Sequence, residues 1–188
     1  MAGLGTRERM LIGAVEVMRE RGASGVTVDE VLARSGAPRG SVYHHFPNGR
    51  GQIVMEALDY AGAAIDAVIE KALQRGSLAT IDAFTRWWTT MLEQTDFNAG
   101  CPVMGAAVGA GPDDAELAAA AGSWFTRWTT GMEKALIHEG IPRARAKRLA
   151  ALALTSIEGA IAVSKSTAST KPLKHTASEL KSLLKMLA

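Results

Sequence analysis

The chain has 188 residues and a net charge of +2, with 47% hydrophobic and 21% charged residues. This composition is typical of a folded protein and disfavours disorder over most of the length. The small net charge does not identify a nucleic-acid-binding protein, so a binding face would need local clustering of charge. A single cysteine excludes an internal disulfide and a thiolate zinc cluster.

The N-terminal segment from Met1 to Arg9 lacks the apolar core of a signal peptide. No apolar run approaches the roughly 18 residues that a membrane span requires. We therefore expect a cytoplasmic protein that does not interact with the membrane.

Apolar residues recur with a helical period over nearly the whole chain, and no segment alternates as a strand would. We therefore expect an all-α protein of about nine helices. The first helix is predicted from about Thr6 to Arg21 and ends at Gly22. Longer helices are predicted at about 50–74, 78–94, 113–139, 143–168 and 176–187, with a short helix at 103–109 and Lys171-Pro172 in the final loop.

Two short helices are predicted between residues 27 and 46. Thr27 and Glu30 have the spacing of a capping box, which begins the first of them. Gly36 and Pro38 interrupt that helix within two turns, and Pro47 ends the next one after Phe46. Two short helices joined by a glycine-containing turn indicate a helix-turn-helix motif. We expect an N-terminal three-helix domain over residues 1–48 and a second helical domain over 49–188.

The second short helix has two faces. Val42 and Phe46 lie four residues apart and can hold one face against the first helix. Arg39, Tyr43 and His44 gather on the opposite face, where an arginine can donate two hydrogen bonds to a guanine edge in the major groove. The alternative is a surface helix packed by its aromatic side chains, with Tyr43 and His44 merely solvated.

Other residues of this region are candidates for contacts that hold the protein on DNA. Gly40 leaves room for close approach of the backbone, and the polar side chains can bond phosphate oxygens. Free N–H groups at a helix N-terminus can also hold a phosphate. The DNA-binding candidates are Thr27, Arg39, Gly40, Ser41, Tyr43, His44, His45 and Arg50. We expect no metal site at the adjacent histidines, because neighbouring helical residues point about 100° apart.

Residues 36–46 read GAPRGSVYHHF, and this segment resembles the signature helix of TetR-family repressors, with similarity over about residues 6–60. The resemblance implies a homodimer that binds a near-palindromic operator, with Arg39, Gly40, Tyr43 and His44 at the groove. The chain departs from the family pattern at Leu32, where many members have a small residue. It also has Pro47-Asn48-Gly49-Arg50 where many members are lysine-rich.

The C-terminal half is similar to the lincomycin-resistance-repressor-like subgroup of that family. The segments FPNGR at 46–50, GCPV at 100–103 and IPRARA at 141–146 support this resemblance. It implies control of an efflux or enzyme gene by an aromatic or drug-like ligand.

All four tryptophans lie in two predicted helices of the second half, accompanied by methionine and phenylalanine. A pocket lined by such side chains suits a flat apolar ligand, although aromatic residues at helical spacing are also typical of a core. The ligand-binding candidates are Phe84, Trp87, Trp88, Met91, Cys101, Met104, Trp124, Phe125, Trp128 and Ile157. Cys101 is otherwise a buried small hydrophobic residue or a redox-sensing thiol.

The last two predicted helices suggest the dimer interface. A leucine stripe runs along the last helix, and small residues give the helix before it a face for close packing. These are Leu180, Leu183, Leu184 and Leu187, and Ala150, Ala153, Ser156, Gly159 and Ala160. The alternative is packing within one subunit.

The sequence therefore favours a DNA-binding regulator, a repressor released by a small-molecule inducer. We expect no enzyme activity and no cofactor, because no catalytic triad, metal cluster or phosphate-binding glycine loop is visible. Two other functions stay open: an enzyme or carrier that uses the apolar cavity, and a structural or adaptor helical bundle.

Overall fold

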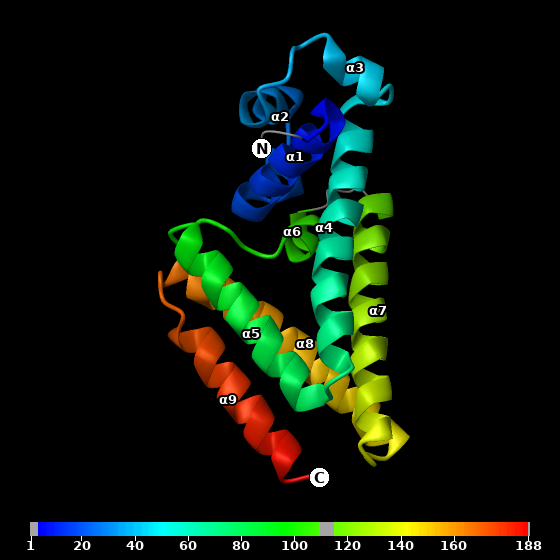
Figure 1. Ribbon diagram of the computed structural model, residues 1–188, viewed down its shortest axis with the longest axis vertical. Coiled ribbons are helices and arrows are strands. Elements are labelled where there is room, and N and C mark those ends of the chain that lie inside the picture. The colour runs from blue at the N-terminus through cyan, green and yellow to red at the C-terminus, as the bar shows by residue number, and fades with distance from the viewer. Residues whose placement is uncertain (1–3, 110–114, 188) are drawn as a thin grey trace. The chain divides into compact units, whose positions relative to one another are not determined.

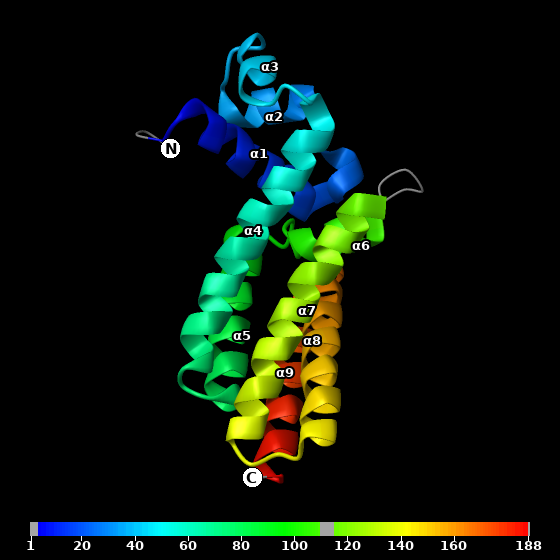
Figure 2. The same cartoon turned by 90° about the vertical axis from the view of Figure 1, so that its right-hand side faces the viewer.

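The computed structural model describes residues 4–109 and 115–187, and these residues form α-helices with no strand. The all-α prediction is confirmed (Figures 1 and 2). The helices are α1 (Thr6–Arg21), α2 (Val28–Ser35), α3 (Ser41–His45), α4 (Gly49–Leu73), α5 (Ser77–Gln94), α6 (Pro102–Gly109), α7 (Ala115–His138), α8 (Arg143–Ser166) and α9 (Lys171–Lys185), with a 3₁₀ turn η1 (Ala23–Gly25) after α1.

The chain forms two compact units. Unit 1 comprises residues 1–63 and 102–122, and unit 2 comprises residues 64–101 and 123–188. These compact units do not follow the predicted domain boundary after residue 48. That boundary stays a prediction. Helix α4 contributes to both units, and α6 belongs with the N-terminal helices although it follows α5 in sequence.

Unit 1 is built around α1, which buries Met10, Ala14, Val17 and Met18. Helix α2 crosses α1 closely at Gly13, where an added Cβ would lie 2.9 Å from the Cβ of Arg34. Helix α6 packs on α1 and η1. These contacts join α2 and α6 to α1.

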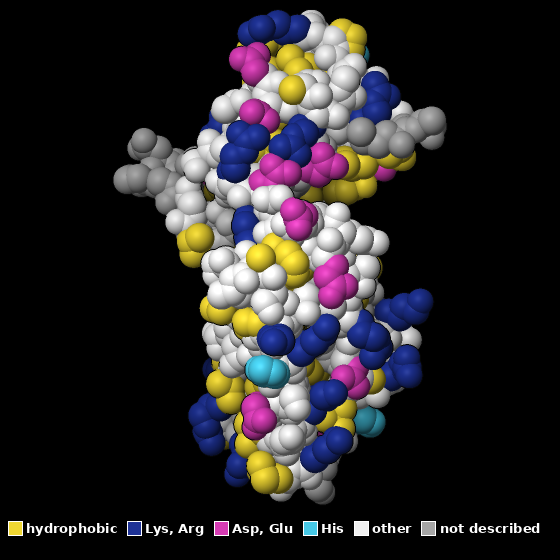
Figure 3. Space-filling view, turned by 90° about the vertical axis from the view of Figure 1, so that its left-hand side faces the viewer, with side chains coloured by type: hydrophobic (Ala, Val, Ile, Leu, Met, Phe, Trp, Pro, Cys, Tyr) yellow, Lys and Arg dark blue, Asp and Glu magenta, His cyan; other side chains and the backbone are white. Residues whose placement is uncertain are grey.

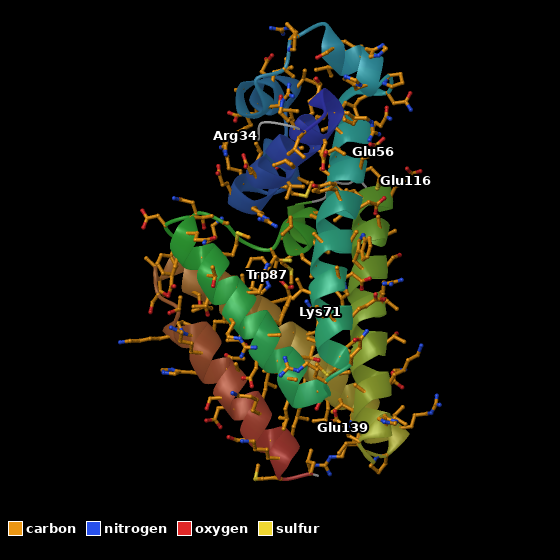
Figure 4. The ribbon with its side chains drawn as sticks, in the orientation of Figure 1. Arg34, Glu56, Lys71, Trp87, Glu116 and Glu139 are labelled. Atoms are coloured by element: carbon orange, nitrogen blue, oxygen red, sulfur yellow. The ribbon has the colours of Figure 1, made fainter. Side chains whose placement is uncertain are left out.

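Unit 2 is built around α5, α8 and α9, which pack on one another. Helices α5 and α8 run in the same direction (Figures 1 and 2). Glu139, which is labelled in Figure 4, directly follows α7. Its carboxylate accepts hydrogen bonds from the backbone N–H and the hydroxyl of Ser77, both at 2.6 Å. These bonds connect the end of α7 to the start of α5. By length and composition α8 alone among the described helices could cross a membrane, but it packs against α5 and α9 as a core helix.

Two helices begin more than two residues away from the predicted position. Helix α3 spans only Ser41–His45, because Pro38 to Gly40 form a turn in which the Ser41 N–H donates to the Pro38 carbonyl. Helix α9 begins at Lys171, so the placement of Lys171-Pro172 in a loop was wrong. Proline is tolerated in the first turn of a helix, because the N–H that it lacks has no helical partner there.

Candidate nucleic-acid interface and small-molecule cavity

Local sequence signals place α2 and the turn that follows it. The Thr27 hydroxyl accepts a hydrogen bond from the Glu30 N–H at 3.2 Å, which confirms the Thr27 half of the predicted capping box. The Glu30 carboxylate accepts hydrogen bonds from Arg21 instead. Gly36 ends α2 at φ +62°, a conformation that favours glycine, and its N–H donates to the Leu32 carbonyl. These two ends fix the length of α2 and the direction in which the chain enters α3.

Helix α3 is held down by two fully buried side chains, Val42 and Phe46. The Arg7 guanidinium lies 5.0 Å from the Phe46 ring centroid and pairs with Glu56 of α4, which is labelled in Figure 4. A cation above an aromatic ring adds to the anchoring by apolar burial. Side chains from α1 and α4 therefore fix the orientation of α3.

The opposite side of α3 is open. Tyr43 is 66% exposed, His44 is exposed, and the Arg39 side chain is 81% exposed in the turn before the helix. An added Cβ at Gly40 would meet nothing within 4 Å. We call Arg39, Gly40, Tyr43 and His44 the recognition face. The structure thus brings the four groove candidates together on one exposed surface.

The remaining DNA-binding candidates have varied surroundings. The Ser41 hydroxyl donates to the Pro38 carbonyl, and the half-buried His45 ring lies 5.0 Å from that of His44. Thr27 is exposed at the start of α2. Arg50 has a structural contact that sequence reasoning missed: its Nε donates to the Val26 carbonyl at 2.7 Å and its Nη2 to the Ala23 carbonyl at 2.8 Å.

Charge in the N-terminal region is balanced. Residues 1–63 contain seven arginines, seven acidic residues and no lysine. Arg21 pairs with Glu30, Arg34 with Glu20 at 2.7 Å, and Arg39 with Asp29 at 3.2 Å. The hydrogen bond to Glu20 raises the pKa of Arg34 above its ordinary value. Most positive charge in this region is therefore used within the protein.

Unit 2 contains a small apolar cavity of about 50 Å³ among α4, α5, α7 and α8. Its walls are almost entirely hydrocarbon and aromatic. They comprise Ile69, Thr80, Ile81, Phe84, Trp128, Thr129, Met132, Ala150, Ala153, Leu154 and Ile157. Such a lining suits an apolar molecule.

The structure brings three ligand-binding candidates, Phe84, Trp128 and Ile157, to this cavity. Trp88 and Cys101 are buried away from its lining. Trp87, Met91, Trp124 and Phe125 are partly exposed in unit 2, and Met104 is partly exposed in unit 1. The aromatic rings form two clusters, Phe84 with Trp87 and Trp88 on α5, and Trp128 with Trp124 and Phe125 on α7.

One buried acid in unit 2 was missed by sequence reasoning. Glu158 on α8 is 2% exposed, and neither carboxylate oxygen has a hydrogen-bond partner of good geometry among the described residues. Burial raises its pKa to about 7, and the neighbouring Cys101 thiol opposes the rise. The sequence did contain one indication of this buried acid, because Glu158 is the only charged residue between 149 and 164.

Comparisons with known proteins agree with this architecture. Residues 11–51 match the bacterial regulatory proteins of the tetR family, and residues 77–179 match the C-terminal domain of LmrA/YxaF-like transcriptional regulators. An uncharacterised HTH-type transcriptional regulator of Mycobacterium tuberculosis is 41% identical over 185 residues, which are 96% of this chain and 94% of the relative. The regulator LmrA of Bacillus subtilis is 28% identical over 96% of this chain and 97% of its own.

Solved structures share the fold. A TetR regulatory protein from Rhodobacter sphaeroides superposes with a TM-score of 0.83 at 22% identity, covering 94% of this chain and 97% of its own. A TetR regulator from Chloroflexus aurantiacus has a TM-score of 0.81 at 24% identity, covering 96% and 94%. At these identities the likeness is one of fold alone.

Proposed function

The chain belongs to the TetR family of bacterial transcriptional regulators, in its LmrA/YxaF-like group, and we propose that it is a cytoplasmic repressor released from its operator by an apolar small molecule. One observation supports the DNA-binding site above all others. Arg39, Tyr43 and His44 are exposed on a helix and turn whose other side is anchored by the buried Val42 and Phe46. An exposed face of arginine, tyrosine and histidine is unusual for a helix that needs only solvation, and it suits contacts in a DNA groove.

The recognition face suits the major groove. Arg39 can form a bidentate contact with a guanine edge, and Gly40 permits close approach of the backbone. The Tyr43 hydroxyl and the His44 ring are donors on short, semi-rigid side chains that lose little conformational freedom on binding. Together they provide a compact set of base and phosphate contacts.

Contacts with phosphates rely little on free cations. The start of α2, where Thr27 caps the helix, offers backbone N–H groups to an anion. The seven arginines of residues 1–63 are offset by seven acids, so few condensed counterions would be released on binding. We therefore expect the operator affinity to fall less steeply with salt than that of a lysine-rich DNA-binding protein.

Exposed apolar residues on α8 and just after the end of α9 support a homodimer. Leu152 is 43% exposed, Val163 49% and Met186 75%, and Leu152, Leu183 and Met186 line a groove between these helices. Figure 3 shows apolar side chains reaching the surface between lysines and arginines on the face of unit 2 with α9. Pairing across a twofold axis would bury this surface. Binding to successive major grooves then requires the two recognition faces to lie about 34 Å apart, or a multiple of that.

The small size of the cavity suggests how a ligand would release the protein from DNA. At about 50 Å³ it is well below the roughly 300 Å³ at which ligand pockets begin. A ligand must therefore bind better to another conformation, in which α4, α5, α7 and α8 lie further apart around it. Helix α4 belongs to both units, so a shift at its C-terminal end can alter the spacing of the recognition faces and reduce the DNA-bound population.

An electrophoretic mobility-shift assay with the DNA upstream of the coding sequence tests the DNA-binding site. We expect the wild type to bind, and both Arg39→Ala and Tyr43→Ala to lose operator binding while they keep helical circular dichroism. Tyr43→Phe should weaken binding if the hydroxyl contacts a phosphate. Tyr60→Phe is the matched control, because Tyr60 is the other tyrosine of the chain and lies on α4.

Wild-type affinity in both alanine variants would rule out the recognition face as the groove-binding surface. Analytical ultracentrifugation of the wild type and Leu183→Glu tests the dimer. A wild-type monomer would exclude the proposed pairing, and a dimer undisturbed by the added charge would place the interface elsewhere.

A further inference from the structure

The chemical character of the ligand can be argued from Glu158. Both of its carboxylate oxygens are buried without a hydrogen-bond partner of good geometry in the part of the chain that the structure describes. The nearby Cys101 thiol interacts with the carboxylate, but a thiol is only a weak donor. A buried carboxylate without strong partners is costly in its ionised form, so its presence calls for a reason other than packing.

The other buried carboxylate of unit 2 shows what Glu158 lacks. Asp66 is 8% exposed and accepts a hydrogen bond from Nε of Arg127 at 2.7 Å in an ion pair. Within the described residues, no lysine, arginine or histidine pairs with Glu158. A positively charged partner for this group would therefore have to come from outside the chain.

Glu158 lies next to the cavity along α8. Leu154 and Ile157 line the cavity, and Glu158 is one turn beyond Leu154 on the same helical face. A helical side chain leans over the turn that precedes it, which directs the carboxylate back toward Leu154. Glu158 does not itself line the cavity, but this geometry places it next to the lining residues Leu154 and Ile157.

Helix α5 extends the same end of the site. It runs in the same direction as α8 (Figures 1 and 2), and Trp88 is one turn beyond the cavity-lining Phe84. Trp88 is fully buried, and its indole N–H has no partner among the described residues, as is also true of Trp128 in the cavity wall. Aromatic faces from Phe84 and Trp128 can stabilise a cation that enters between them.

We propose that Glu158 is the polar anchor of the inducer and that the inducer is a lipophilic organic cation, a ring system with a protonated nitrogen. The apolar cavity would take the rings, and the ammonium would donate to the Glu158 carboxylate at its end. The inference rests on the proposed function, because it names the ligand class of the same site. A neutral hydroxyl would supply one hydrogen bond but leave the buried charge uncompensated.

Isothermal titration calorimetry with three probes of one shape tests this assignment. The probes are 1-naphthylmethylamine, which is protonated at neutral pH, 1-naphthalenemethanol, which is neutral, and 1-naphthoate, which is an anion. We expect the wild type to bind the amine about thirtyfold or more tightly than the alcohol, because a desolvated charge pair is worth several kcal/mol in other complexes. The anion should bind weakest, since it would lie against a carboxylate.

Glu158→Gln keeps the shape of the side chain and removes its charge. In this variant we expect the preference for the amine over the alcohol to disappear, while the affinity for the alcohol changes by less than about threefold. Glu93→Gln, an exposed position on α5, is the control and should retain the wild-type preference. Wild-type binding of the amine by Glu158→Gln would overturn the proposal. Equal binding of amine and alcohol by the wild type, or no binding of any probe, would do the same.

The gel-shift assay separates this inference from the function itself. Addition of the amine should release the wild type from DNA, and Glu158→Gln should bind DNA normally but resist release. If the wild type binds no DNA while the calorimetric preference holds, the repressor function fails and the assignment of Glu158 stands.

Discussion

The two units differ in one buried charged group. In the N-terminal region nearly every arginine has an internal partner, as with Arg21 and Glu30 or Arg34 and Glu20. In unit 2 the buried Glu158 has no basic partner among the described residues. The first arrangement makes a rigid base for an exposed recognition face, and the second leaves a buried group that a ligand can satisfy. Paired charges stabilise the fold here, and the unpaired buried charge is the basis of the proposed binding site.

The largest expected effect on stability distinguishes the buried anchor residues of α3 from its exposed recognition face. Phe46→Ala removes a fully buried ring and should lower the free energy of unfolding by about 3–5 kcal/mol. Tyr43→Ala, which truncates a side chain that is 66% exposed, should change it by less than about 0.5 kcal/mol while abolishing operator binding. Urea unfolding followed by circular dichroism measures both. Equal destabilisation by the two changes would contradict the distinction between a buried anchor at Phe46 and an exposed recognition residue at Tyr43.

The next effect concerns the buried acid of unit 2. Burial raises the pKa of Glu158 from its ordinary value of 4.5 to about 7, so between these values the folded state binds more protons than the unfolded state. Wild-type stability therefore loses a contribution as the pH rises from about 4.5 to 7. Glu158→Gln lacks this loss and should be more stable than the wild type at pH 8, by on the order of 3 kcal/mol, and similar at pH 4.5.

Denaturant unfolding of both proteins across this pH range measures the difference between their free energies of unfolding. The contributions of all other titrating groups cancel in this difference. Glu93→Gln serves again as the control and should show no such change. A difference between wild type and Glu158→Gln that does not vary with pH would mean that the pKa of Glu158 is the same in the folded and unfolded states, so that burial does not raise it.

A smaller effect tests the assignment of α6 to unit 1. A Cβ at Gly105 would lie 3.1 Å from the Met18 carbonyl oxygen and 3.3 Å from the Gly22 Cα. Because both are backbone atoms that cannot rotate away, Gly105→Ala should destabilise the protein by about 1–3 kcal/mol. The control is Gly51→Ala on α4, where an added Cβ meets nothing within 4 Å and should stabilise by up to about 1 kcal/mol. The same sign for both variants in thermal unfolding would contradict this packing.

The smallest effect on stability is expected at the recognition face. Arg39 pairs with Asp29 at 3.2 Å, with side chains 81% and 73% exposed, and such a surface pair contributes less than about 1 kcal/mol. Asp29→Asn should leave unfolding nearly unchanged but raise operator affinity a few-fold, because it frees Arg39 and removes a negative charge beside the DNA. The gain should shrink at high salt. Weaker binding by Asp29→Asn would show that Asp29 positions Arg39 for contact.

Prediction from the sequence succeeded where the structure depends on near neighbours. The cap at Thr27, the glycine that ends α2 and the Val42–Phe46 anchor each involve residues within four positions of one another, and helix geometry alone then places Tyr43 opposite. Prediction failed where a proline is compatible both with a loop and with the first turn of a helix, as at Pro172 in α9.

The candidate site in unit 2 could be predicted only in part. Helical spacing indicated aromatic stripes, but it could not say which residues would border a cavity, and only Phe84, Trp128 and Ile157 of the candidates do. The contacts of Arg50 with Val26 and Ala23 and the interaction of Glu158 with Cys101 join residues more than twenty positions apart. No local pattern encodes such contacts.

The sequence by itself thus determined the helical class, the helix-turn-helix and the exposed recognition face, because caps, turn residues and the 3.6-residue period act over short distances along the chain. Only the tertiary structure decided that α6 packs with the N-terminal helices, that Arg50 is a structural tie and that Glu158 is buried beside a cavity. Those outcomes depend on which distant surfaces meet and exclude water, and that is settled by packing of the whole chain.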